Sequence, residues 1–149
     1  MNNYELLSEL HKECFPSKPW PAGEFKNLQK AGCEIIASEN AFIVWRAVAD
    51  EAEIITLGVR PSARRTGAAA ALLSVTENEL RKRNIKKIFL EVSADNWPAI
   101  KLYEKSDFAR AGVRRKYYAG IDGIMMTKDL QPAGRDSQAV IPARAGMTN

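Results

Sequence analysis

Cysteine and histidine are scarce in this chain of 149 residues, which has two cysteines, Cys14 and Cys33, and one histidine, His11. So few thiol and imidazole groups cannot supply the ligand set of a structural zinc site, so no metal is expected. A disulfide between the two cysteines is not expected in a reducing cytoplasm. A Cys–His nucleophile would need Cys14 and His11 to converge. We instead interpret them as a helix-surface histidine beside a partly buried cysteine.

Long apolar runs are also lacking. No stretch approaches the ~18 apolar residues that a membrane span requires. The first residues, MNNYELLSELHKECF, carry acids and lack the apolar centre of an export signal. Hydrophobic residues make up 46% and charged residues 27%, a balance typical of soluble globular proteins. We therefore expect a cytoplasmic chain with no membrane association.

Positive charge is in excess, with a formal net charge of +4, and it is clustered. The basic residues gather in three groups: Arg64 with Arg65; Arg81, Lys82, Arg83, Lys86 and Lys87; and Arg110, Arg114, Arg115 and Lys116. Such groups suit a polyanion, either a nucleic acid or a phosphorylated cofactor. Charge alone does not choose between them.

Hydrophobic periodicity predicts the order of helices and strands. Helices are expected over 3–13 and 22–30, separated by the proline-rich FPSKPWP. Strands are expected at 34–38, 41–48 and 52–59, joined by short polar turns that suit antiparallel pairing. A helix then covers 68–83, with one apolar stripe formed by Ala69, Leu72, Leu73, Thr76 and Leu80.

The second half continues with a strand at 86–93, a helix at 98–105 and two strands at 109–118 and 121–129. The strand at 86–93 follows a helical crossover, which predicts parallel pairing with the strand that ends at Val59. These elements make a mixed α/β domain over residues 1–130. The tail, 131–149, has no sustained period and is expected to be flexible.

The segment from Leu57 to Ala69 has the features of an anion site. An apolar strand ends, a loop follows, and a helix opens on small residues. Backbone N–H groups at a helix N-terminus are unpaired and favour an anion. Gly67 and Ala69 leave this backbone uncovered, so a diphosphate could approach closely. The segment is neither a Walker loop nor a GxGxxG fingerprint.

This segment resembles the GNAT acetyltransferase signature R/Q-x-x-G-x-G/A, here Arg64-x-x-Gly67-x-Ala69. A second similarity follows in Glu91-Val92-Ser93, Asn96 and the A-x-x-L-Y-E run at Ala99–Glu104. The resemblance, over about residues 5–130, implies a mostly antiparallel sheet with one parallel pair splayed at an acetyl-CoA site and helices on both faces. The residues implied for acetyl-CoA binding are Leu57, Gly58, Val59, Arg64, Arg65, Thr66, Gly67, Ala68, Ala69 and Asn96. Asn96 could also simply cap the helix after it.

Acetyl transfer to an amine needs a base, oxyanion stabilisation and a proton for the thiolate. Glu91 lies in the apolar run IFLEV, which we expect to be covered on both faces, where an unused carboxylate is costly. Tyr103 shares a helix face with Ile100 and has a phenol that could protonate a thiolate. An exposed Glu91 and a merely packed Tyr103 are the structural alternatives. The resemblance implies that Glu91 and Tyr103 are catalytic, and the Val59 N–H is our candidate oxyanion donor.

More narrowly, the LEV, Asn, LYE and RRxYY spacing and the FPSKPW segment are similar to the RimI type, which acetylates the N-terminal alanine of a ribosomal protein. Departures are Asp107 in place of a usual Gly, no leading strand, which leaves a bare sheet edge, and a short Ala119-Gly120 turn beside the acceptor groove. Tyr117 and Tyr118 could line that groove. Two other functions stay open: acetylation of a small amine or another protein amine, and a non-catalytic acyl-CoA-binding or RNA-binding module. Direct nucleic-acid binding is not expected, and the sequence does not choose between monomer and dimer.

Overall fold

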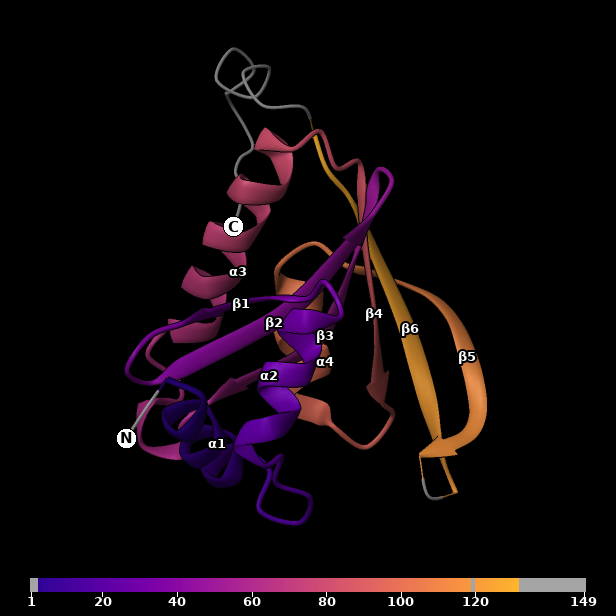
Figure 1. Cartoon of the computed structure of the whole chain (residues 1–149). Coiled ribbons are helices and arrows are strands. Elements are labelled where there is room, and N and C mark those ends of the chain that lie inside the picture. Colours follow the sequence, from indigo (N-terminus) through magenta and orange to yellow (C-terminus); the bar gives the residue numbers. More distant parts are fainter. Residues whose placement is uncertain (1–2, 119, 132–149) are drawn as a thin grey trace. The chain divides into compact units, whose positions relative to one another are not determined.

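A computed structural model describes residues 3–118 and 120–131 and contains four α-helices, one short 3-10 helix and six strands in that part of the chain (Figure 1). The helices are α1 (Asn3–Cys14), α2 (Ala22–Lys30), η1 (Pro61–Ala63), α3 (Ala68–Lys82) and α4 (Trp97–Lys105). The strands are β1 (Glu34–Ala37), β2 (Ala41–Val48), β3 (Glu51–Val59), β4 (Lys87–Ser93), β5 (Ala109–Tyr118) and β6 (Ile121–Asp129). The predicted order of elements is confirmed. The tail from residue 132 lies outside the described residues.

The six strands form one sheet in the order β1-β2-β3-β4-β6-β5. β3 and β4 pair in parallel over Glu51–Glu53 and Lys87–Phe89, as the helical crossover between them predicts. β1 with β2, β4 with β6 and β5 with β6 are antiparallel. The predicted mixed α/β class with one parallel pair is therefore confirmed. The chain divides into two compact units, Met1–Arg46 with Ile54–Thr76 and Ala47–Glu53 with Glu77–Asn149.

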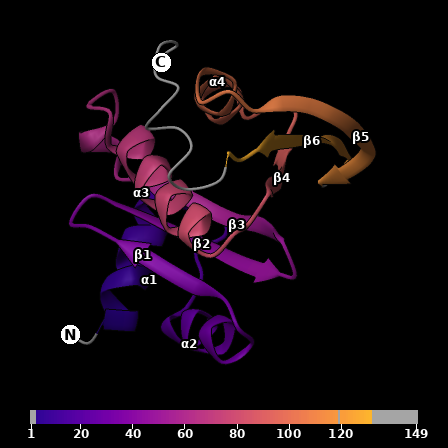
Figure 2. The ribbon, with the colours of Figure 1, turned by 90° about the horizontal axis from the view of Figure 1, so that it is seen from above.

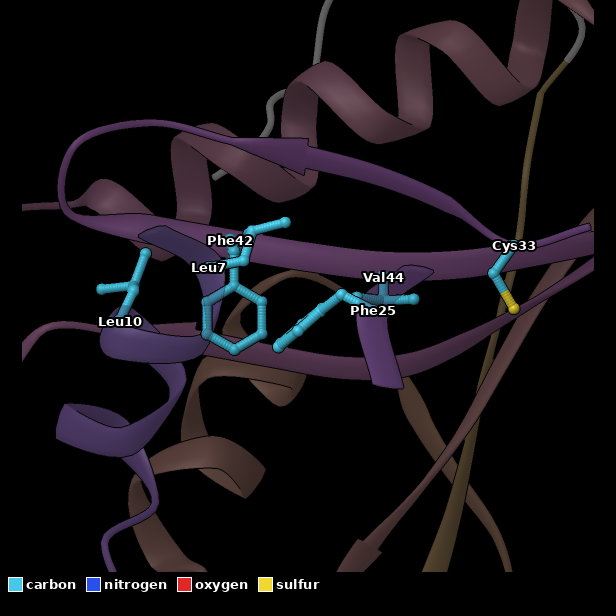
Figure 3. Close-up of a cluster of buried hydrophobic side chains, with 6 residues drawn as sticks. All are labelled: Leu7, Leu10, Phe25, Cys33, Phe42 and Val44. Carbon is cyan, nitrogen blue, oxygen red and sulfur yellow. The ribbon is translucent and has the colours of Figure 1, made fainter. Parts of the chain in front are cut away.

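The first unit has a core of aromatic and aliphatic side chains under α1 and α2. Figure 3 shows six of them: Leu7, Leu10, Phe25, Cys33, Phe42 and Val44. Helices α1 and α2 lie on one side of β1 and β2, and the first half of α3 lies on the other (Figure 2). Among the described residues no strand pairs with the outer edge of β1, which agrees with the bare edge expected there.

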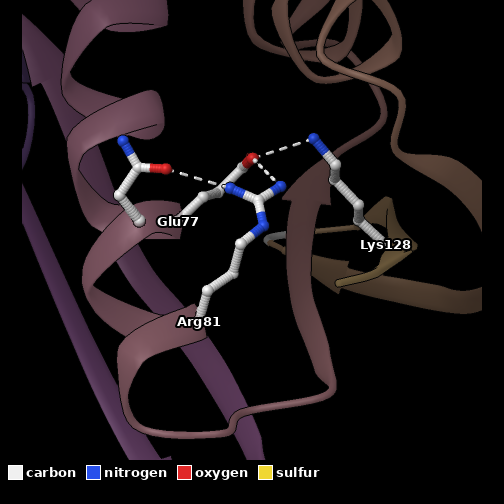
Figure 4. Close-up of polar contacts among 4 residues, drawn as sticks. Glu77, Arg81 and Lys128 are labelled. Atoms are coloured by element: carbon white, nitrogen blue, oxygen red, sulfur yellow. Dashed lines mark hydrogen bonds and ion pairs between the residues drawn. The ribbon is translucent and has the colours of Figure 1, made fainter. Parts of the chain in front are cut away.

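The second unit is built on β4, β6 and β5. Ile88, Leu90 and Val92 alternate along β4 and are buried, with α4 contributing Ile100 to the buried set. In the second half of α3, Glu77 is 6% exposed and forms an ion pair of 2.9 Å with Lys128 of β6 (Figure 4). A buried carboxylate is tolerated because this lysine compensates its charge.

A second cation completes this pairing, because Arg81 lies 3.6 Å from the same Glu77 oxygen.

Periodicity placed Thr76 and Leu80 on the buried stripe of the helix, and both are 0% exposed, whereas Ala69 is half-buried. The burial of Glu77 was not predicted, since a charged residue beside the stripe reads as solvent-facing. Among the described residues no helix is both long and apolar enough to span a membrane.

Candidate functional site

The N-terminus of α3 with the loop just before it, residues 64–70, is the first part of the candidate site and is called the mouth of α3. It lies in the first unit. β3 ends at Val59, η1 follows, and α3 begins at Ala68. Gly67 accepts a backbone hydrogen bond from the Ala71 N–H, so the amides of residues 68–70 are those that a helix leaves unpaired. Residues 64–67 are exposed, and the residues opening the helix are alanines. The helix dipole and uncovered amides can therefore accept an anion such as a diphosphate.

Left-handed backbone shapes this loop. Gly67 has a φ of +83°, and a Cβ placed on it would meet no atom within 4 Å. Glycine is therefore needed here for its backbone conformation and for the bare surface it leaves, not for packing space. Arg65 also has a positive φ, 66°, a conformation that costs a non-glycine residue energy.

The arginines of the loop bring positive charge to the same mouth. The Arg64 Nε–H donates to the Val59 carbonyl oxygen over 3.1 Å, which ties the loop to the strand end. The Thr66 hydroxyl donates to the Ala63 carbonyl oxygen and closes the turn. Arg64 and Arg65 are both exposed. An anion at the α3 mouth would thus find two guanidinium groups on the adjoining loop.

Packing gives Gly58 a role that sequence reasoning missed. A Cβ on Gly58 would lie 2.7 Å from Phe42 Cε1 and 3.0 Å from the Cys14 sulfur. Real Cβ atoms do not approach other atoms so closely, so any side chain would displace this core. Leu57 and Val59 on either side are half-buried. Phe42 lies on the neighbouring strand β2 and Cys14 at the end of α1, and no local sequence pattern indicates that both meet Gly58.

Glu91 lies in the second unit, near the end of β4. The strand alternates, with Ile88, Leu90 and Val92 buried and Phe89 and Glu91 half-buried. The expectation that this strand is covered on both faces is therefore wrong. Three of the apolar residues in the run IFLEV form the single buried face. The fourth, Phe89, lies on the half-buried face and made the run look covered on both sides. The Glu91 side chain is 15% exposed, and its Oε2 is buried.

Arg114 of β5 is the ionic partner of Glu91, and the sequence did not indicate it. Its Nε lies 3.1 Å from Glu91 Oε2. Two basic residues at 114 and 115 read as a solvated face, and only the strand order β4-β6-β5 brings one of them to Glu91. Tyr117 and Tyr118, predicted to line a groove nearby, have side chains outside the described residues.

Asn96 and Tyr103 are held by α4 in the same unit. Asn96 caps the helix, because its Oδ1 accepts the Ala99 N–H over 3.3 Å. The structural interpretation of Asn96 is thus confirmed, whereas its contact with a cofactor stays a prediction. Tyr103 is 6% exposed, and its ring lies 5.4 Å from that of Phe108 in an edge-on contact. Burial raises the pKa of Tyr103, so its phenol stays protonated at neutral pH. After α4, Asp107 adopts a φ of 71°, the left-handed conformation expected of it.

His11 and Cys14 carry no nucleophile. His11 is 2% exposed, so its expected place on the helix surface is wrong. Burial lowers the pKa of His11, which favours the neutral ring. Burial also raises the pKa of the half-buried Cys14 thiol, and the opposing influence of Arg64 is smaller. A thiolate is therefore disfavoured at Cys14.

A separate cavity of about 850 Å³ lies in the first unit. Its lining residues come from α1, α2, β1, the turn after β1 and the residue after β3, and include Leu6, Leu10, Lys26, Ile35 and Arg60. Arg60 is held there by an ion pair of 2.7 Å with Glu13. None of the predicted site residues lines this cavity.

Comparisons with known proteins add to this geometry. Residues 3–108 match the family model described as the acetyltransferase (GNAT) family. The [ribosomal protein bS18]-alanine N-acetyltransferase of Escherichia coli K12 is 42% identical over 83 residues, which cover 56% of this chain and 56% of that protein. The Haemophilus ducreyi protein of the same name is 34% identical over 110 residues, which cover 70% of this chain and 76% of that one. The match to the first of these relatives thus spans little more than half of its length.

Among solved structures, the chain is similar to the ribosomal-protein-S18-alanine N-acetyltransferase from Escherichia coli. The two share a TM-score of 0.78 and 29% sequence identity, over 91% of this chain and 94% of that one. Ard1 from Thermoplasma volcanium is similar with a TM-score of 0.75 at 21% identity, covering 87% of this chain and 95% of that one, a likeness of fold alone.

Proposed function

The chain belongs to the acetyltransferase (GNAT) family, and from this membership we propose that it transfers the acetyl group of acetyl-CoA to the α-amine of a protein that begins with alanine. The acceptor is proposed from the relatives that are named bS18-alanine N-acetyltransferases. The observation that carries the proposal is the exposed mouth of α3, where Gly67 leaves backbone amides open to an anion. This feature fits the diphosphate of coenzyme A.

In this proposal the loop and the first turn of α3 bind the diphosphate. The uncovered amides at residues 68–70 donate to its oxygens, and Arg64 and Arg65 add charge. The backbone of Leu57, Gly58 and Val59 is proposed to bind the pantetheine arm, with the Val59 N–H as the donor to the oxyanion. Bound acetyl-CoA supplies an electrophilic thioester carbonyl.

The catalytic step is assigned to Glu91 and Tyr103. Glu91 accepts a proton from the acceptor ammonium, directly or through a water, so that the free amine forms a C–N bond to the acetyl carbon. The C–S bond then breaks, Tyr103 gives its phenol proton to the departing thiolate, and the second proton of the acetylated amine returns to Tyr103. No covalent enzyme intermediate is needed, which agrees with the disfavoured thiolate at Cys14.

The test is turnover by the purified chain. We expect thiol release from acetyl-CoA with a peptide that carries the alanine N-terminus of bS18, and none with the same peptide already acetylated at its N-terminus. Spermidine in place of the peptide tests a small-amine acceptor. Binding of coenzyme A without thiol release on any amine would show a non-catalytic binder. RNA retention in a gel without coenzyme A binding would show an RNA module. Each of these last two outcomes overturns the proposal.

A further inference from the structure

Arg114 and Glu91 meet across an intervening strand. In the register of the sheet, Gly123 of β6 lies opposite both Arg114 of β5 and Ser93 of β4. Glu91 lies two residues before Ser93, on the same face of β4. Arg114 therefore reaches over β6 to bring its Nε to 3.1 Å from Glu91 Oε2.

The missing side chain at Gly123 makes this contact possible. A Cβ on Gly123 would lie 2.5 Å from Glu91 Oε2 and 3.2 Å from Glu91 Cδ. Gly123 is itself buried, although no helical conformation or positive φ requires glycine there. The Glu91 carboxylate thus occupies the space that a side chain at residue 123 would take.

Just after Arg114, β5 has an irregular stretch that is hydrogen-bonded to β6. The register shifts between Arg114 and Tyr118, and Lys116 has a φ of 53°. Asp122 of β6 stabilises this stretch, because its Oδ1 accepts the Lys116 N–H and its carbonyl oxygen accepts the Ala94 N–H, each over 2.8 Å. One residue thereby ties β5 to β6 and to the end of β4, which limits where the Arg114 backbone can lie.

The two partners of the ion pair differ in exposure. The Glu91 side chain is 15% exposed and that of Arg114 is 53% exposed. The carboxylate is therefore shielded while its cation extends into solvent. Oε2 has no hydrogen-bond donor of acceptable geometry among the described residues. Oε2 is itself buried, so the attraction of Arg114 holds this end of the carboxylate inside the protein.

We propose that Arg114 is the positioning residue of the catalytic carboxylate: it holds Glu91 Oε2 over Gly123 and so fixes the orientation in which the carboxylate receives the proton of the acceptor ammonium. This inference rests on the proposed function. Arg114 orients the Glu91 carboxylate and does not contact the reacting atoms, so any effect of Arg114 on the rate must pass through Glu91.

The experiment compares Arg114→Met with Arg114→Lys in steady-state acetylation of the alanine peptide. We expect Arg114→Met to lower kcat roughly tenfold or more with the KM for acetyl-CoA unchanged, because a misplaced catalytic group costs rate. Arg114→Lys should recover part of the loss, since it keeps the charge. Arg115→Met, at the neighbouring exposed arginine, is the matched control and should leave kcat within twofold of the parent.

Two further variants show whether Arg114 acts through Glu91. In a Glu91→Gln background Arg114→Met should change kcat by less than about twofold, because the group it positions is already lost. Gly123→Val should lower kcat as Arg114→Met does, while coenzyme A binding and the melting temperature show that each variant is folded.

Parental activity in Arg114→Met overturns the proposal, as does an equal loss with and without Glu91. Failure of the proposed function looks different, because the parent chain would then release no thiol with any amine.

Discussion

The backbone N–H of Trp20 donates to Nδ1 of His11 over 3.1 Å, and the indole stacks on the imidazole with ring centroids 4.6 Å apart. This pair joins α1 to the turn before α2. Phe25 and Phe42 surround the same imidazole, with ring centroids 5.8 Å and 5.7 Å away. His11 is therefore part of the core of the first unit, and its Nδ1 must be unprotonated to accept the bond.

The stability of the chain should fall as the pH drops below about 6.5, the ordinary pKa of histidine. Burial lowers the pKa of folded His11, so the unfolded chain binds the proton first and is favoured by acid. The free energy of unfolding should decrease by up to about 1.4 kcal/mol per pH unit in this range. Urea unfolding at pH 7.5 and 5.5 measures the effect. In His11→Gln the difference in unfolding free energy between the two pH values should be smaller. An unchanged difference would mean that another group causes the pH dependence.

Glu91→Gln and Tyr103→Phe should each lower kcat roughly a hundredfold or more, because each removes one proton transfer. Both substitutions nearly preserve shape, so coenzyme A affinity should stay near that of the parent. Stopped-flow or steady-state thiol release measures the rate. Acetylation within threefold of the parent in both variants would contradict the assigned roles.

Gly67→Ala should weaken coenzyme A binding roughly tenfold, because a Cβ at a φ of +83° strains the backbone that leads into the first turn of α3. Titration calorimetry measures the dissociation constant. Gly23→Ala is the matched control, since Gly23 lies in α2 with nothing within 4 Å of its Cβ position and no positive φ. That control should bind coenzyme A as the parent does. Folded parent protein that ignores coenzyme A would refute the assigned site.

Lys128→Met should destabilise the chain by about 2 kcal/mol, because it leaves the buried Glu77 carboxylate with a weaker cationic partner. Arg81, at 3.6 Å, keeps the loss below that of an unpaired charge. The double variant Glu77→Leu with Lys128→Met should recover part of the stability, since both charges are then gone. Chemical unfolding of the three proteins tests this. A double variant less stable than Lys128→Met would show that packing, and not charge, dominates here.

Local features of the chain were predictable because their causes lie within a few residues. The α3 stripe, the Asn96 cap and the left-handed Asp107 all follow from nearby residues, and the structure has each of them. The opening of α3 after Gly67 was predicted for the same reason. Backbone conformation and helix capping are short-range effects.

Long-range contacts account for what the sequence left out. His11, expected on a helix surface, is buried because Trp20, Phe25 and Phe42 converge on it. Glu77 is buried because Lys128 reaches it from a strand 51 residues away. No period of 3.6 or 2 residues contains this information, since it depends on which elements pack together.

By itself, the sequence determined the mixed α/β class, the parallel pair and the opening of α3 after Gly67, and it indicated the two residues proposed for proton transfer. Only the tertiary structure decided how one of those residues is held. Arg114, Gly123 and Glu91 belong to three different strands, and their contact requires the order β4-β6-β5 and the register of both pairings. Side-chain periodicity assigns a residue to a face of its own strand, whereas strand order and register decide which side chains meet on that face.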